Sequence, residues 1–169
     1  GSIVGESILL ELAPMMTALV MTGRIGATIA AEIGTMRVTE QIDALESLSF
    51  DPISFLILPR ILAAVVMFPI LVIIADCFGI LGGLFAAVNA MDVSYLEFIR
   101  GLRNWFRPWD AWFGLIKGMF FGLAITSIAC YQGFYTTGGA NGVGRATTST
   151  VVISCVAIVF LDYILAAIL

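Results

Sequence analysis

Two residues of opposite charge lie inside long apolar runs of this chain and are the first candidates for chemistry. Glu11 lies near the start of the run 8–31, and Lys117, the only lysine, lies near the start of the run 111–135. A charge near the centre of a bilayer costs about 2.5–3.5 kcal/mol on insertion scales, so it usually has a partner or a task. If the two lie at similar depth, they either line a polar opening for a charged headgroup or form a salt bridge at a helix end.

Two further ionisable residues interrupt apolar runs. Arg24 has a side chain long enough to snorkel towards the interface, which is the simplest interpretation of its position. Asp162 could hold a proton or an ion, but a single acid is more often capped by a neighbouring hydroxyl or close to an interface. We therefore expect a structural place for both.

The sequence contains no motif typical of a hydrolase active site, a metal site or a nucleotide site. The chain has no histidine, the commonest general base and metal ligand, and it lacks a G-x-S-x-G elbow or a paired-aspartate motif. Cys77, Cys130 and Cys155 lie in apolar runs without metal-like spacing, so we expect them to pack in the core. The glycine-rich stretch 136–145 lacks the Lys-Ser/Thr ending of a phosphate loop, and we interpret it as a flexible turn with 147–150 capping the next helix.

The composition indicates lipid as the natural solvent of the elements that carry these residues. The chain is 60% hydrophobic and 12% charged, with a mean hydropathy of +1.06, whereas an ordinary soluble domain is about 25% charged. The run 53–90 would extend about 57 Å as a straight helix, nearly twice the hydrocarbon thickness, so we expect it to be broken. We predict an all-α, polytopic helical bundle with four membrane segments, 8–31, 53–90, 111–135 and 146–169.

The segment 32–51 differs from its neighbours because charged residues alternate with apolar residues at approximately helical spacing. It is either a solvated connector or an amphipathic docking element for a partner, since apolar anchors on a short helix fit a groove. The eight basic residues are scattered and divide equally between the two predicted sides of the membrane. They therefore indicate no nucleic-acid partner, and the positive-inside rule sets no orientation.

Several stretches resemble the MlaE (Yrb-type) permeases of ABC transporters. They are ELAPMMTAL at 11–19, GRIGA at 23–27, AEIGTMRVTEQIDAL at 31–45 and GVGRATTSTVV at 142–152. The resemblance implies a homodimeric permease that moves phospholipid between the inner membrane of a diderm bacterium and a periplasmic Mce-domain protein. It also implies a separate ABC ATPase that uses the ATP, no cofactor on this chain itself, and room for a small cytoplasmic accessory protein.

The resemblance assigns roles to particular positions. Glu11 and Lys117 match charged residues of the family's lipid cavity. Segment 32–51 becomes the cytoplasmic coupling element and 91–112 becomes periplasmic. The residues expected to couple to the ATPase are Glu32, Arg37, Glu40, Gln41, Asp43 and Leu45. Family members usually have an amino-terminal interfacial helix and a further membrane helix ahead of the part seen here, so we expect residues 1–169 to be one permease transmembrane domain lacking both.

Other classes of protein remain alternatives at this point. A secondary transporter driven by protons or ions through Asp162, Glu11 or Asp76 would work without any ATPase. An intramembrane enzyme and a purely structural scaffold have less support. Four or five spans are too few to enclose a lipid, so a dimer is the economical solution for a transporter.

Overall fold

The computed structural model describes residues 7–90, 94–105 and 107–168 of the chain. All regular elements among these residues are helical. Four helices are long and apolar enough to cross a membrane: Leu10–Val38, Ile53–Asn89, Pro108–Phe134 and Gly139–Ile168. The predicted all-α polytopic bundle is therefore confirmed. The start of the segment 91–112 and the last residue of the predicted membrane segment 146–169 lie outside the described residues.

The first membrane helix runs without interruption through four successive elements. Two of them, η1 (Ile8–Leu12) and η2 (Thr22–Gly26), are wide π-helical turns, and each is followed by an α-helix, α2 (Ala13–Met21) and α3 (Ala27–Val38). The first wide turn comes directly before Pro14, which cannot donate a backbone hydrogen bond to the preceding turn. The helix also continues past Ala31, so Glu32 and Arg37 lie on α3.

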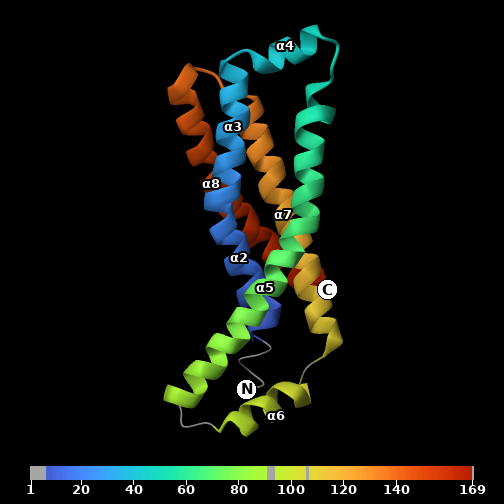
Figure 1. Ribbon diagram of the computed structural model, residues 1–169, viewed down its shortest axis with the longest axis vertical. Helices are drawn as coiled ribbons and strands as arrows, with labels where there is room; N and C mark the ends of the chain where they lie inside the picture. Colours follow the sequence, from blue (N-terminus) through green and yellow to red (C-terminus); the bar gives the residue numbers. More distant parts are fainter. Residues whose placement is uncertain (1–6, 91–93, 106, 169) are drawn as a thin grey trace.

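The remaining helices alternate between the two ends of the bundle (Figure 1). The short helix α4 (Gln41–Ser47) lies at one end, and η3 (Ile53–Ile57) with α5 (Leu58–Ala90) returns along the bundle. At the other end, α6 (Tyr95–Trp105) leads to α7 (Pro108–Phe134), and α8 (Gly139–Ile168) follows. Figure 1 shows α5 changing direction part-way along, but it stays one helix with Pro69 inside it rather than the broken helix that the sequence predicts.

The two turns at the α4 end have clear local causes. Asp51 accepts hydrogen bonds from the backbone N–H of Ile53 at 3.2 Å and of Ser54 at 3.3 Å, and so caps the helix that begins at Pro52. Between α7 and α8, Gly138 and Gly139 have φ angles of 90° and 66°, which favour glycine. The helix starts at once, so the predicted flexible turn 136–145 is wrong for 139–145.

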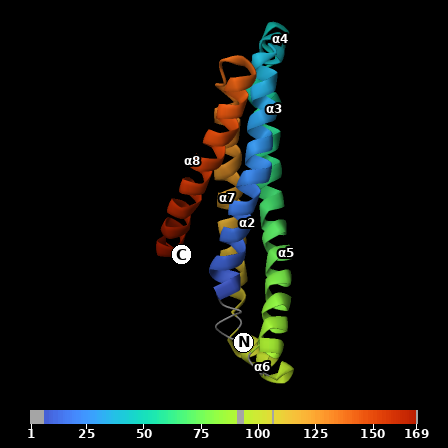
Figure 2. The same ribbon diagram turned by 90° about the vertical axis from the view of Figure 1, so that its left-hand side faces the viewer.

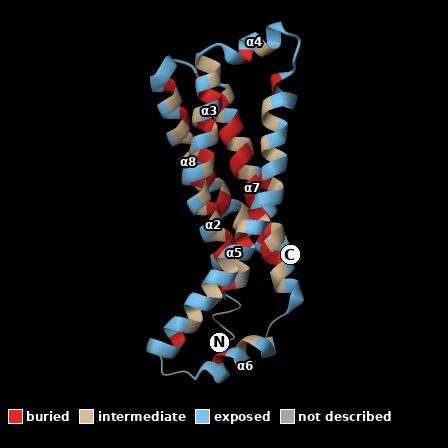
Figure 3. Cartoon of the chain, in the orientation of Figure 1, coloured by how far each residue is buried: buried red, intermediate tan, exposed pale blue. Residues whose placement is uncertain are grey.

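Helix α7 forms the centre of the bundle and packs against α3, α5 and α8 (Figures 2 and 3). Its side chains are the most buried of the four membrane helices. Close contact with α5 depends on small residues: a Cβ atom added at Gly122 would lie 2.7 Å from Cγ of Phe68. Gly118 and Gly122, which have GxxxG spacing, therefore lie at the crossing of α5 and α7.

Large apolar side chains also cover the outer faces of α5 and α8. Phe78 and Phe85 on α5 and Phe160 and Tyr163 on α8 are among the most exposed of them. Such a surface suits lipid or another membrane helix, not water. Of the three cysteines, Cys130 is buried and Cys155 is half-buried, but Cys77 is exposed, so its predicted place in the core is wrong.

Candidate functional site

Three charged side chains from three different helices meet inside the bundle. Lys117 on α7 is fully buried, and its Nζ lies 2.9 Å from Oε1 of Glu11 on η1 and 2.8 Å from Oδ1 of Asp162 on α8. The contact with Glu11 is a hydrogen bond, whereas Asp162 Oδ1 lies within ion-pair distance without hydrogen-bond alignment. The structure thus brings together the two residues paired by sequence reasoning and adds a third.

The backbone explains why the lysine points towards η1. Pro14 has no N–H to donate, which leaves the carbonyl of Leu10, four residues earlier, without its usual α-helical partner. Nζ of Lys117 lies 3.3 Å from this carbonyl oxygen and donates to it. The ammonium also lies 4.8 Å from the centroid of the Phe113 ring, one turn earlier on α7. Lys117 is therefore surrounded by acceptors and by a π face.

The carboxylates of this cluster differ in exposure. The side chain of Glu11 is 46% exposed and that of Asp162 is 17% exposed, whereas Lys117 is completely covered. The cluster of two carboxylates and one ammonium has a net negative charge when all three groups are ionised. Its most exposed charged group is the carboxylate of Glu11. Within a membrane segment such an arrangement can hold helices together and can also present a polar contact to a charged or zwitterionic ligand.

A second group of charged residues fixes α4 to the bundle. Arg37, in the last turn of α3, has Nη1 2.8 Å from Oδ1 of Asp43 in the first turn of α4. Its guanidinium also lies 5.5 Å from the centroid of the Phe134 ring at the end of α7. Beneath the charges, Ile42 of α4 is fully buried and packs in an apolar cluster with Ile33. One buried anchor and one ion pair therefore hold a helix whose other residues are largely exposed.

The predicted coupling residues take different places around α4. Glu40 precedes the helix in a left-handed conformation with φ 61°, Gln41 and Asp43 are exposed on the first turn, and Leu45 is half-buried. Glu32 lies apart from them on α3, where its Oε2 is 3.1 Å from Nη2 of Arg60 on α5. The six residues thus share one end of the molecule but not one helix.

Asp51, which follows α4, also has a defined electrostatic environment. The hydroxyl of Ser54 donates to its Oδ2 at 2.6 Å, and the backbone N–H of Ile53 donates to Oδ1. These hydrogen bonds favour the ionised carboxylate, the Ser54 hydroxyl most strongly, and lower the pKa of Asp51 from its usual value. The carboxylate that caps the second membrane helix therefore stays charged at neutral pH.

The sequence model for the permease MlaE matches residues 1–168, which is nearly the whole chain. The chain belongs to the MlaE permease family. This membership agrees with the four membrane helices and with the short helix α4 that joins the first two of them.

Individual relatives of this MlaE-family chain come from bacteria and from a plant. A probable ABC transporter permease protein of Rickettsia prowazekii is 44% identical over 165 residues, covering 98% of this chain and 64% of the relative. The intermembrane phospholipid transport system permease protein MlaE of Haemophilus influenzae is 38% identical, covering 100% and 65%. The chloroplastic protein TRIGALACTOSYLDIACYLGLYCEROL 1 of Arabidopsis thaliana is also 38% identical, covering 99% and 48%. The chain thus spans just under two thirds of the length of the bacterial relatives.

Sequence reasoning missed two members of these charged groups. The sequence predicts Asp162 as an isolated acid, although a lone buried lysine with one assigned acid leaves room for a second acid at the same depth. The sequence analysis assigns no role to Arg60, although its position one residue after Pro59 places it near the end of a membrane helix, where ion pairs cost less. Asp76 lies on α5, and its Oδ1 has no hydrogen-bond partner among the described residues.

Proposed function

We propose that this chain is the membrane-embedded part of an ABC transporter permease that moves phospholipid and hydrolyses no ATP itself. The match of the MlaE family over residues 1–168 carries this proposal. The Haemophilus influenzae relative is named for intermembrane phospholipid transport, which supplies the substrate class. In this proposal a bacterial inner membrane holds the protein, an ABC ATPase binds at α4, and an Mce-domain protein receives or delivers lipid at the α6 end.

The charged cluster supports a role in contacting the transported lipid. Lys117 is fully buried among its acceptors, while the carboxylate of Glu11, which accepts from Lys117 through Oε1, is partly exposed and within reach of a headgroup. A polar contact inside a mostly apolar surface is what a lipid with a charged head requires when it passes through the bundle. Glu11 and Lys117 are therefore our candidates for the lipid cavity.

The exposed end at α4 supports a docking role for the ATPase. Ile42 and the pair Arg37–Asp43 fix the helix to α3, so a force applied to the exposed residues of α4 reaches the first membrane helix directly. The coupling residues in this proposal are Glu32, Arg37, Glu40, Gln41, Asp43 and Leu45. A small cytoplasmic accessory protein is a further partner in this proposal.

A second copy of the chain is part of the proposal because one chain leaves a charge exposed along its membrane face. Arg24 is exposed and lies midway along the first membrane helix, 14 residues from each end of Leu10–Val38. At 1.5 Å per residue it is about 12 Å from Glu32 of the proposed coupling group, so its side chain must snorkel over most of that distance unless a second protein surface covers it. A homodimer would cover this residue.

The test is affinity purification of the full-length protein in mild detergent, with mass spectrometry of co-purifying proteins and lipids. The variant Glu40→Lys plus Glu46→Lys reverses two exposed charges at α4, and neither residue has an ion pair with another described residue. Glu97→Lys on α6 is the matched control at the opposite end. We expect an ATPase and phospholipid with the wild type and the control, and loss of the ATPase from the double variant.

A second candidate function rests on the same cluster. Ionisable groups that meet between membrane helices, as Glu11, Lys117 and Asp162 do, also occur in transporters driven by protons or ions. Purification of the wild type without any ATPase, together with transport that needs no ATP, would favour this alternative and overturn the ABC proposal.

A further inference from the structure

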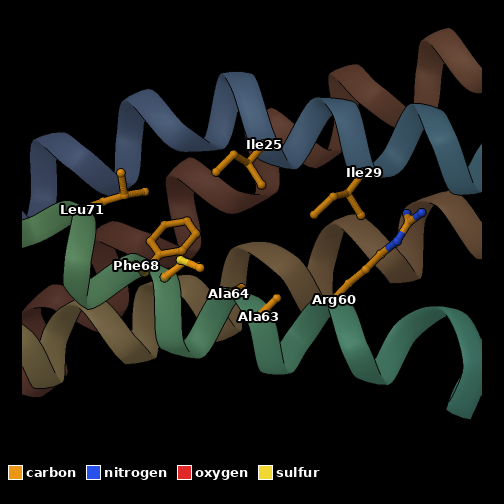
Figure 4. Close-up of a pocket in the computed structure, with 8 residues that line it drawn as sticks. Ile25, Ile29, Arg60, Ala63, Ala64, Phe68 and Leu71 are labelled. Carbon is orange, nitrogen blue, oxygen red and sulfur yellow. The ribbon is translucent and has the colours of Figure 1, made fainter.

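An apolar cleft separates the first membrane helix from α5 in the half of the bundle nearer α4. It has a volume of about 230 Å³, and Ile25 and Ile29 face Ala63, Met67 and Leu71 across it. Figure 4 shows Arg60 at one end of the cleft, reaching from α5 towards α3. Arg60 is the one charged residue in the lining. The cleft is distinct from the Lys117 cluster, none of whose residues line it.

A second hollow continues from the same arginine. It has a volume of about 430 Å³ and is lined by Glu32, Thr35 and Gln41 as well as by Arg60. Polar side chains from α3 and α4 therefore surround one side of the guanidinium, and hydrocarbon surrounds the other. Together the two hollows have the size of an ordinary ligand site, roughly 300–1,000 Å³. One is polar and the other apolar, so together they suit an amphiphilic ligand.

The guanidinium of Arg60 has an unfilled hydrogen-bonding position. Its Nη2 pairs with Glu32 Oε2 at 3.1 Å, but its Nη1 is buried and has no partner among the described residues. A buried donor without an acceptor is costly, and phosphate is an acceptor that the guanidinium fits well. Glu32 is 55% exposed beside it and carries the compensating negative charge. The guanidinium of Arg60 can therefore bind a phosphate, and the carboxylate of Glu32 can bind an ammonium.

We propose that this cleft binds one zwitterionic phospholipid whose headgroup carries a phosphate and an ammonium. The phosphate accepts from Nη1 of Arg60, the ammonium lies at Glu32, and one acyl chain lies between Ile25, Ile29 and α5. Arg60 lies seven residues after the start of the membrane helix Ile53–Asn89, about 10 Å along its axis, which is a depth that headgroups reach. The site needs no ATPase and stands independently of the transport function.

The test places a photo-crosslinking residue, p-benzoylphenylalanine, at Met67 in the cleft of the full-length protein. The control places it at the neighbouring Val66, which is 61% exposed against 57% for Met67 but does not line the cleft. Both proteins are reconstituted in vesicles of equal phosphatidylethanolamine and phosphatidylglycerol with identical chains, irradiated, and their adducts identified by mass spectrometry. Position 66 reports the bulk lipid, so the ratio of the two lipids at 67 measures the selectivity of the cleft.

We expect phosphatidylethanolamine to be enriched about tenfold at 67 over 66, as for one charge-assisted hydrogen bond. Glu32→Gln should abolish the enrichment, because it removes the carboxylate that binds the ammonium, which phosphatidylglycerol lacks. Arg60→Gln should instead lower the yield of both lipid adducts at 67, because both lipids carry the phosphate, whereas Arg145→Gln, which removes an exposed arginine from α8, should leave ratio and yield unchanged. Equal ratios at 67 and 66, enrichment that survives Glu32→Gln, a yield at 67 that Arg60→Gln leaves unchanged, or an adduct at 67 to another part of the protein would each overturn the proposal. None of these outcomes alters ATPase co-purification, so the proposed function is tested separately.

Discussion

The side chain of Lys117 joins α7 to α8 through Asp162, whose Oδ1 lies 2.8 Å from Nζ. The same ammonium contacts Glu11 and the carbonyl of Leu10 on η1. One buried cation therefore links three segments that are far apart in the sequence. Replacing the lysine must affect stability differently from replacing one of the carboxylates, because the lysine is fully buried and the carboxylates are not.

Lys117→Met should destabilise the protein by about 3 kcal/mol, the lower end of the range for a broken buried ion pair. It leaves Asp162 largely buried without its cation and the carbonyl of Leu10 without its donor. Asp162→Asn should cost less, because Lys117 keeps Glu11 and the carbonyl. Thermal unfolding in detergent measures both, and equal stability of Lys117→Met and the wild type would contradict a structural role of the cluster.

The contacts of Arg37 predict a local rather than a global effect. Its side chain is 35% exposed and that of Asp43 is 54% exposed, so the ion pair contributes at most about 1 kcal/mol to global stability. Arg37→Gln also removes the contact with Phe134 and should loosen α4. Hydrogen exchange should become faster in α4 and stay unchanged in α7 and α8. Gln41→Ala changes an exposed residue of α4 that has no part in the ion pair. It is the control, and its α4 should exchange like that of the wild type.

Asp51 predicts a pH dependence at the start of the second membrane helix. Its pKa is lowered in the folded protein, so its capping contribution is present above the ordinary aspartate pKa of about 3.9 and is lost as pH falls through the lower folded value. Amide exchange at Ile53 and Ser54, corrected for its intrinsic pH dependence, should therefore rise only below that range. Asp51→Asn keeps a capping oxygen that does not titrate and should remove this pH dependence, while Asp51→Ala should raise exchange at every pH.

Much of the fold could be predicted because the bilayer fixes the length of its helices. Apolar runs long enough to span the hydrocarbon core predict four membrane segments, and the described part of the chain forms four such helices. The ends of the membrane helices were less predictable, because a charged residue does not by itself end a helix. Glu32 and Arg37 continue α3 for two further turns, where Arg60 and Asp43 neutralise them.

The charged cluster could be predicted only in part. Depth along the run indicates that Glu11 and Lys117 can meet: consecutive spans alternate in direction, so the first and third spans run the same way and their early residues lie at a similar level. Depth does not tell which face of a helix a residue occupies, and Asp162 depends on that rotation. The rotation of α8 is set by packing of buried residues such as Ser154 and Ile158 against its neighbours, which no single segment of sequence specifies.

The contact between α5 and α7 gives the sharpest packing prediction. A methyl group at Gly122 would lie 2.7 Å from Cγ of Phe68, closer than carbon atoms pack, so Gly122→Ala must push the two helices apart or turn the ring. We expect a loss of about 1–3 kcal/mol, as for other overpacked cores. Gly82→Ala is the matched control, because nothing lies within 4 Å of its added Cβ atom, and alanine is the better helix former. Thermal unfolding should therefore separate the two variants, and Phe68→Leu should recover part of the loss in Gly122→Ala by vacating the space that the ring fills.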